Sequence, residues 1–173
     1  MNLGQSMKWS GFPQLVVHQA AWWACVLLQG WTGPLLMLVF LGLHLWMTRT
    51  SFRYELVLIL VSATVGVGLD NALSMLDEVT YEGSVLVVHS PLWLVSIWAG
   101  FGATVRHSQS ILFRTRIHAF LTGLLGGPLA YWGGERLGVL DVFSALSWGT
   151  IGVLWTAAML TLYSTDRYLP PYK

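Results

Sequence analysis

The chain has 173 residues, of which 55% are hydrophobic and 10% are charged, and its formal net charge is +1. A soluble domain carries about 25% charged residues, and a chain this short has too little interior to bury so many apolar side chains. The near-neutral charge argues against nucleic-acid binding. The single cysteine, Cys25, excludes an intrachain disulfide and a thiolate metal cluster.

Six apolar segments predict helices that cross a membrane. A spanning helix needs about 20 predominantly apolar residues, and roughly 17 to 25 are tolerated. In chain order the segments cover residues 13–30, 32–48, 55–76, 90–106, 117–134 and 144–163. The sequence therefore predicts one all-α membrane domain over residues 1–173, a bundle of about six transmembrane helices.

The basic residues predict the orientation of this bundle. Short cytoplasmic loops accumulate lysine and arginine. With six spans, eight basic residues share one side and only Arg136 lies on the other; the eight are Lys8, Arg49, Arg53, Arg106, Arg114, Arg116, Arg167 and Lys173. This distribution predicts that both chain termini are cytoplasmic.

Asp70 is the clearest candidate for a functional residue, because an ionisable group within a spanning helix is costly and marks a site by default. Ser62, Gly66 and Asp70 are four residues apart, so they share one helix face, which we expect to point into the bundle.

The fifth segment carries the expected partners of Asp70. Arg136 follows Glu135 at its outer end, and its long side chain is expected to reach Asp70, with Asn71 and Tyr131 as hydrogen-bonding neighbours. Pro128 is expected to kink this helix. Asp70, Asn71, Tyr131, Glu135 and Arg136 thus form a candidate polar cluster on the outer side. An ion pair that locks two helices and a binding or proton-handling site are both open interpretations.

A second candidate cluster is expected on the inner side. Its members are four histidines and one arginine near the cytoplasmic ends of the segments: His18, His44, Arg106, His107 and His118. His18 and His44 are expected at a similar depth, which suggests a b-type haem between helices as one alternative. Contacts to loops and lipid headgroups are the other.

Familiar catalytic and metal-binding motifs are missing. The five histidines form no H-x2-H or H-x3-H pair, and no G-x-S-x-G, H-E-x-x-H or P-loop pattern occurs. The sequence therefore predicts no catalytic residue, no metal site and no cofactor apart from the haem alternative, and it leaves open whether the chain is an enzyme.

Two motifs carry a resemblance. PLWLVSIWAGFGATVRHS at 91–108 and GGPLAYWGGERLG at 126–138 resemble a bacterial family of small polytopic inner-membrane proteins that is classed as a domain of unknown function. The resemblance covers most of the chain and implies a multi-pass protein of the bacterial inner membrane. In that family the genes are often found near those for cyclopropane-type fatty-acid synthases and photo-oxidative stress functions, which implies a link to membrane lipid modification.

Together these features favour a non-enzymatic module that binds lipid or assists a lipid-modifying partner. The expected partners are membrane lipids, with a lipid-modifying enzyme or a second copy of the chain as further candidates, and no nucleic acid. Two alternatives remain open. A small transporter or channel is suggested by Gly-Pro pairs at 33–34 and 127–128, in corresponding positions of two three-helix halves. An intramembrane enzyme would use Asp70 or Glu135 as acid or base.

Overall fold

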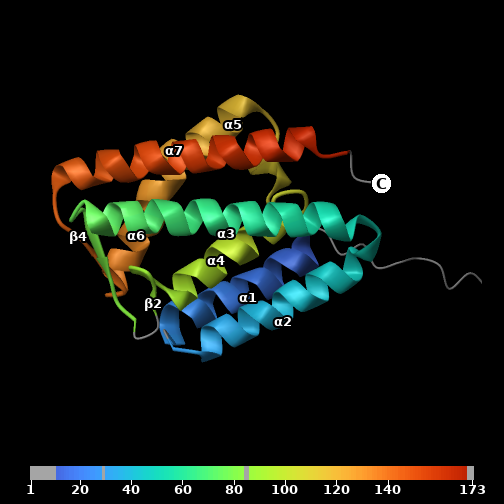
Figure 1. Ribbon diagram of the computed structural model, residues 1–173, viewed down its shortest axis with the longest axis horizontal. Helices are drawn as coiled ribbons and strands as arrows, with labels where there is room; N and C mark the ends of the chain where they lie inside the picture. Colours follow the sequence, from blue (N-terminus) through green and yellow to red (C-terminus); the bar gives the residue numbers. More distant parts are fainter. Residues whose placement is uncertain (1–10, 29, 84–85, 171–173) are drawn as a thin grey trace, which may run out of the picture.

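The computed structural model describes residues 11–28, 30–83 and 86–170, which form a helical bundle (Figure 1). This confirms the all-helical prediction, and each of the six apolar segments contains a helix. The helices are α1 Phe12–Leu28, α2 Thr32–Met47, α3 Phe52–Met75, α4 Leu92–Thr104, α5 Arg116–Leu121, α6 Gly127–Arg136 and α7 Ala145–Tyr168, with short 3-10 turns η1 Arg49–Ser51 and η2 Ser110–Phe113.

The fifth predicted segment is a continuous helical rod in three parts. Between α5 and α6 lies a π-helical segment, η3, which covers Thr122–Gly126. Pro128 follows as one of the first residues of α6. Proline lacks an N–H donor, and a π-helical turn is a common way for a helix to absorb such an interruption. The π segment ends two residues before Pro128, at which the sequence predicts a kink.

The loops at one end of the bundle contain short strands that the sequence did not predict. β1 Val79–Tyr81 pairs antiparallel with β4 Leu140–Val142, and β2 Leu86–Val87 pairs with β3 Ser90–Pro91. The loop after α3 and the loop before α7 hydrogen-bond to each other through their backbones, which ties these two helices together at this end.

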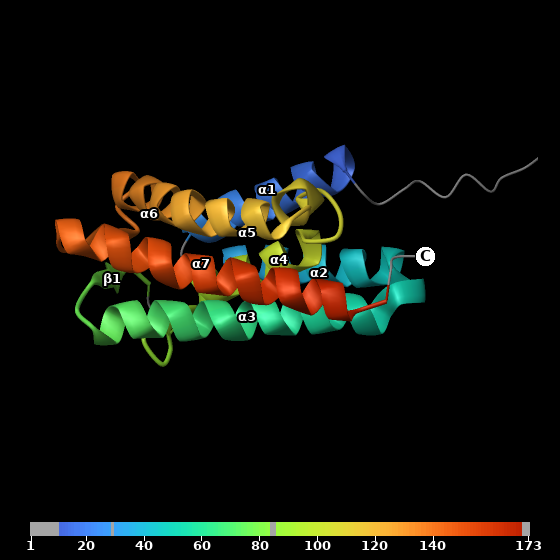
Figure 2. The ribbon, with the colours of Figure 1, turned by 90° about the horizontal axis from the view of Figure 1, so that it is seen from above.

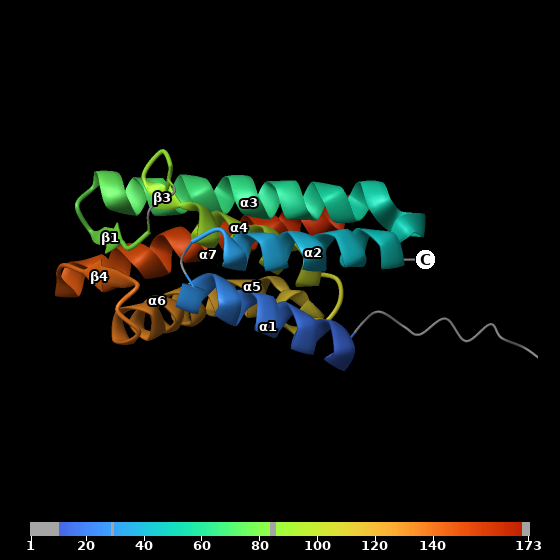
Figure 3. The same ribbon diagram turned by 90° about the horizontal axis from the view of Figure 1, so that it is seen from below.

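The helices form three layers. Figures 2 and 3 show α1 and the α5–α6 rod on one side of the bundle and α3 on the opposite side, with α2, α4 and α7 between them. In Figure 1, the start of α1, the α2–α3 turn and the end of α7 lie at one end, here named the inner end. The strands lie at the opposite, outer end.

α3 and α4 pack closely because small residues line their contact. A Cβ atom on Gly102 would lie 2.6 Å from the carbonyl oxygen of Leu58, and one on Gly66 would lie 2.0 Å from the Trp98 ring. The Ser62 hydroxyl also donates to the carbonyl oxygen of Trp98 at 2.6 Å. The expected small-residue face of α3 is therefore occupied by α4.

Among the described residues, two helical stretches are long and apolar enough to cross a bilayer, by length and composition alone. They are Arg49–Met75, with 27 residues, and Ala145–Tyr168, with 24. Three further apolar helices are shorter: Phe12–Leu28, Thr32–Met47 and Leu92–Thr104. The α4 helix, with 13 residues, is the shortest of these three.

Candidate functional site

Asp70 lies on α3 with no exposed surface, and three neutral donors reach its carboxylate. The Trp98 indole N–H donates to Oδ2 at 2.8 Å, and the Tyr131 hydroxyl donates to Oδ1. The Tyr81 hydroxyl lies 3.4 Å from the same Oδ1 and 3.1 Å from the Tyr131 oxygen. Burial raises the pKa of Tyr81 above its ordinary value, so its phenol stays protonated and can donate. The donors come from α4, α6 and β1, so the carboxylate joins three elements to α3.

The expected contact between Asp70 and Arg136 is wrong for the described chain. No ion pair joins them, and the Arg136 guanidinium lies over the Trp132 ring at 5.5 Å from its centroid. Tyr131, one turn nearer the interior, already supplies the hydrogen bond that Arg136 was expected to make. The three donors give both carboxylate oxygens a hydrogen-bond partner without Arg136.

The other two members of the predicted outer cluster do not join Asp70 either. The Asn71 amide donates to the Val67 carbonyl oxygen at 2.7 Å and accepts from the His89 N–H at 2.6 Å, so it fixes the loop before α4. Glu135 is half-buried at the end of α6. The structure therefore brings together Asp70 and Tyr131 from the predicted set, and adds Trp98 and Tyr81.

A lateral groove opens beside this cluster. α1 packs on α2 and α4, whereas the α5–α6 rod packs on α7, and the groove lies between these two groups. Its volume is about 280 Å³. The lining is mainly aliphatic and aromatic and includes Trp22, Trp93, Leu94, Ile97, Trp98, Phe101, Leu112, Ala130, Tyr131, Val139, Leu140 and Trp155.

A few polar side chains interrupt the apolar groove wall. The indole N–H of Trp155 lacks a hydrogen bond among the described residues. His18 is 2% exposed, lies next to the Gln19 side chain as a hydrogen-bonding neighbour, and packs against Phe40, with ring centroids 5.4 Å apart. Gln109 and Thr122 also line the groove. The groove is thus mainly apolar, with a few points where a ligand could form a hydrogen bond.

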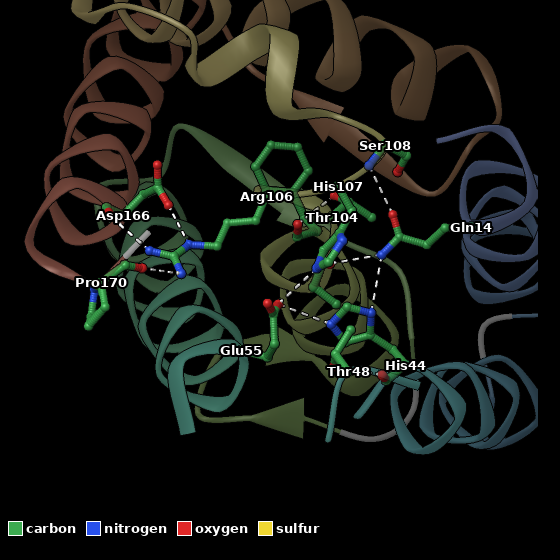
Figure 4. A network of polar contacts seen from close by, with 12 residues as sticks. Gln14, His44, Thr48, Glu55, Thr104, Arg106, His107, Ser108, Asp166 and Pro170 are labelled. Carbon is green, nitrogen blue, oxygen red and sulfur yellow. Dashed lines mark hydrogen bonds and ion pairs between the residues drawn. The ribbon is translucent and has the colours of Figure 1, made fainter. Parts of the chain in front are cut away.

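At the inner end, two of the predicted histidines meet a buried glutamate (Figure 4). Nε2 of His44 and Nε2 of His107 each lie 3.2 Å from Oε2 of Glu55, and the His44 and Glu55 side chains have no exposed surface. The two imidazole rings are at 81° with centroids 5.0 Å apart. The residues come from the end of α2, the first turn of α3 and the turn after α4.

Gln14, on α1, determines how His44 is protonated in this arrangement. Its Oε1 accepts from the Ser108 N–H at 3.0 Å, and its Nε2 donates to the Ala103 carbonyl oxygen at 3.0 Å. These two bonds fix the amide, so the nitrogen faces Nδ1 of His44 at 3.2 Å. Nδ1 is therefore the acceptor, and the His44 proton is on Nε2, directed at Glu55.

The remaining predicted inner residues lie elsewhere. Nε of Arg106 pairs with Asp166 at 2.5 Å, which joins the end of α4 to the end of α7. His118 is exposed, and its Nδ1 lies 2.7 Å from the Thr115 hydroxyl. His18 does not meet His44 directly, since Phe40 packs against both imidazoles, and the haem alternative stays a prediction.

Sequence reasoning missed Glu55 and Gln14. Glu55 starts the third apolar segment, where a carboxylate is read as a solvated residue at a helix end. Yet it is the one acidic residue in the first turn of α3, and Arg49 and Arg53 precede it closely in the sequence. The signal that could have identified Glu55 is an ionisable residue at the start of an apolar segment.

The comparisons with known proteins identify the family. Residues 12–161 match the model of a family described as "Protein of unknown function (DUF2878)". The chain belongs to this family. No curated protein and no solved structure matches the chain. The family resemblance inferred from the two sequence motifs is thereby confirmed, and it brings no known activity with it.

Proposed function

We propose that the chain is an integral protein of the bacterial inner membrane that binds a lipid acyl chain in its lateral groove. In this proposal the six helical rods cross the bilayer, both termini are cytoplasmic, and the protein serves as a non-enzymatic module linked to membrane lipid modification. The observation that carries the proposal is the groove between α1 and the α5–α6 rod, whose wall is almost entirely apolar.

The surface of the bundle supports a membrane location. Large apolar side chains are more than half exposed along several helices, and in water such a surface would promote aggregation. Among them are Leu27, Leu35, Leu38, Val39, Leu60, Leu125, Leu129, Leu146 and Val153. Meanwhile polar side chains such as Gln14, Glu55 and Asp70 are buried in the interior. Apolar groups outside and polar groups inside suit a protein whose solvent is hydrocarbon.

The short α4 is compatible with this location. At about 1.5 Å per residue its 13 residues extend roughly 20 Å, less than the roughly 30 Å of a bilayer core. Non-helical backbone at membrane depth is tolerated where protein covers it. α4 lies between α1, α2 and α3, and the β2–β3 hairpin and the turn after Thr104 extend it at its two ends.

The groove favours an acyl chain over a water-soluble ligand. A volume of about 280 Å³ is at the lower end for small-molecule pockets, so it suits a segment of a lipid better than a whole lipid. Trp22, Ile97 and Phe101 offer apolar contact, and no charged side chain lines the wall. An acyl chain that contacts this wall buries apolar surface and leaves no charged side chain of the wall without a partner.

The alternatives receive less support from the described residues. A transport path or an acid–base centre at Asp70 would need that carboxylate to be accessible, whereas three donors enclose it and it has no exposed surface. Glu135, the other candidate acid, lines none of the groove.

The proposal is tested by filling the groove. Ala130 is an exposed residue of α6 on the groove wall, so Ala130→Trp places an indole in the space of the acyl chain. Val153→Trp is the matched control, because Val153 on α7 is 66% exposed and lies outside the groove.

The measurement is the lipid bound per protein after purification in mild detergent, by native mass spectrometry. We expect wild type and Val153→Trp to retain lipid, and Ala130→Trp to lose it while still eluting as a single species. Equal lipid retention by the two tryptophan variants would overturn the proposal.

A further inference from the structure

The three side chains at the inner end have a geometry that a proton network alone does not explain. Both imidazoles lie against the same oxygen of Glu55, Oε2, while the other oxygen, Oε1, is buried and has no hydrogen-bond partner in the described part of the chain. A buried carboxylate oxygen without a partner is costly, because burial removes its water and nothing replaces it. This unpartnered oxygen points to a missing positive ligand.

We propose that His44, Glu55 and His107 bind one divalent transition-metal ion of the zinc class. Each residue offers a ligand atom, and these atoms all lie within 4.8 Å of one another. Two histidines and one carboxylate are a common ligand set for zinc and for other first-row metals. The proposal does not depend on the lipid groove, since it concerns other residues at the inner end.

The two printed separations between ligand atoms, both from an imidazole to the carboxylate, suit such an ion. Ligand atoms about 2.1 Å from one metal lie roughly 3.0 to 3.4 Å apart when the coordination angle is between about 90 and 110°. The two imidazole–carboxylate separations, each 3.2 Å, fall in this range. Glu55 Oε1 can then join as a second oxygen of a bidentate carboxylate, which would satisfy the unpartnered atom.

The ligands also come from fixed positions. His44 is in the last turn of α2, Glu55 is in the first turn of α3 and His107 follows α4, and their side chains are almost completely buried. The sequence shows no metal-binding motif here, because His44 and Glu55 are 11 positions apart and Glu55 and His107 are 52 positions apart. Only the packing of three helices brings them together.

Gln14 is the residue that sets the affinity in this proposal. A metal on Nε2 of His44 moves the ring proton to Nδ1, which then needs an acceptor. In the described arrangement Gln14 presents its nitrogen to Nδ1, because Ser108 and Ala103 fix the amide. Glutamine therefore opposes binding, and a carboxylate at this position would form the carboxylate–histidine–metal arrangement that strengthens such sites.

The experiment uses the full chain, purified in detergent, stripped with chelator and titrated with Co(II), whose visible absorption bands report imidazole and carboxylate ligation; Zn(II) then competes for the same site. We expect one Co(II) per chain, displaced by one Zn(II). Glu55→Gln, which keeps the size of the side chain, should weaken binding at least tenfold. Gln14→Glu should tighten it by roughly tenfold, the scale of outer-shell partners.

His118→Gln is the matched control, because His118 is an exposed histidine outside the cluster. It should bind Co(II) as wild type does. Absence of Co(II) bands in the folded wild-type protein would overturn the proposal, even if the Glu55 variant fails to fold. Binding that survives Glu55→Gln unchanged, or that disappears with His118→Gln, would also overturn it.

Discussion

The two faces of α4 differ in what covers them. Toward α3, the helix interlocks with protein: Gly102 touches the Leu58 backbone, and the Trp98 ring lies directly over Gly66. Toward α1 and α6, side chains such as Leu94, Ile97 and Phe101 line the groove. Both faces are apolar. On the first face, small residues let α3 approach closely, whereas the second face borders the groove and suits an apolar ligand.

Trp98, in the Asp70 cluster, belongs to both the packed face and the groove face of α4. Trp98 contributes to both faces, since its ring covers Gly66 and lines the groove, while its N–H donates to Asp70. The carboxylate thus fixes the orientation of a groove-lining aromatic ring. We interpret Asp70 as a residue that shapes the groove and does not face it.

The largest expected effect tests the packed face. Gly66→Leu would place a side chain where its first carbon already meets the Trp98 ring at 2.0 Å. Overpacking costs about 1 to 3 kcal/mol and occasionally more, and we expect the upper end here because Asp70 holds the Trp98 N–H and the Trp155 ring packs against Trp98, with centroids 4.6 Å apart. Thermal unfolding in detergent measures the effect.

Gly68→Leu is the matched control on the same helix, because a Cβ at Gly68 meets nothing within 4 Å. Replacing a glycine in a helix favours helix formation by up to about 1 kcal/mol, so this variant should keep or raise the melting temperature. If the two leucine variants unfold at the same temperature, α3 and α4 do not pack as described.

An intermediate effect is expected at the junction between the two faces. Tyr131→Phe removes a hydroxyl donor from the buried Asp70 carboxylate and leaves Trp98 and the more distant Tyr81 as its donors. Loss of a partner of a buried charged group costs about 1 to 3 kcal/mol or somewhat more. The free energy of unfolding should fall by this amount.

Tyr54→Phe serves as the comparison for this variant, because Tyr54 is exposed near the start of α3. Its stability should stay within about 0.5 kcal/mol of wild type, as for most surface substitutions. A Tyr131→Phe protein as stable as Tyr54→Phe would show that the hydroxyl does not support Asp70.

The sequence allowed the helices and the inward face of α3 to be predicted, because apolar length and four-residue spacing are local properties. The predictions failed where a contact depends on how far a side chain reaches or on which segments become neighbours in the fold. Arg136 was expected at Asp70 from side-chain length, yet Tyr131 occupies that position from one turn deeper. The chain reverses direction at the η1 turn between α2 and α3, and this reversal brings His44 to Glu55. Residue spacing along the sequence does not reveal this contact.

The most direct measurement of the central claim is photo-crosslinking in proteoliposomes that contain a phospholipid with a diazirine on its acyl chain. Mass spectrometry locates the labelled residues. If a lipid chain occupies the groove, label will appear on the groove face of α4, at Leu94, Ile97 or Phe101, and Ala130→Trp will remove it without changing the label on exposed Val153. Label confined to the exposed outer residues, with the groove face of α4 unlabelled in wild type, would contradict the claim.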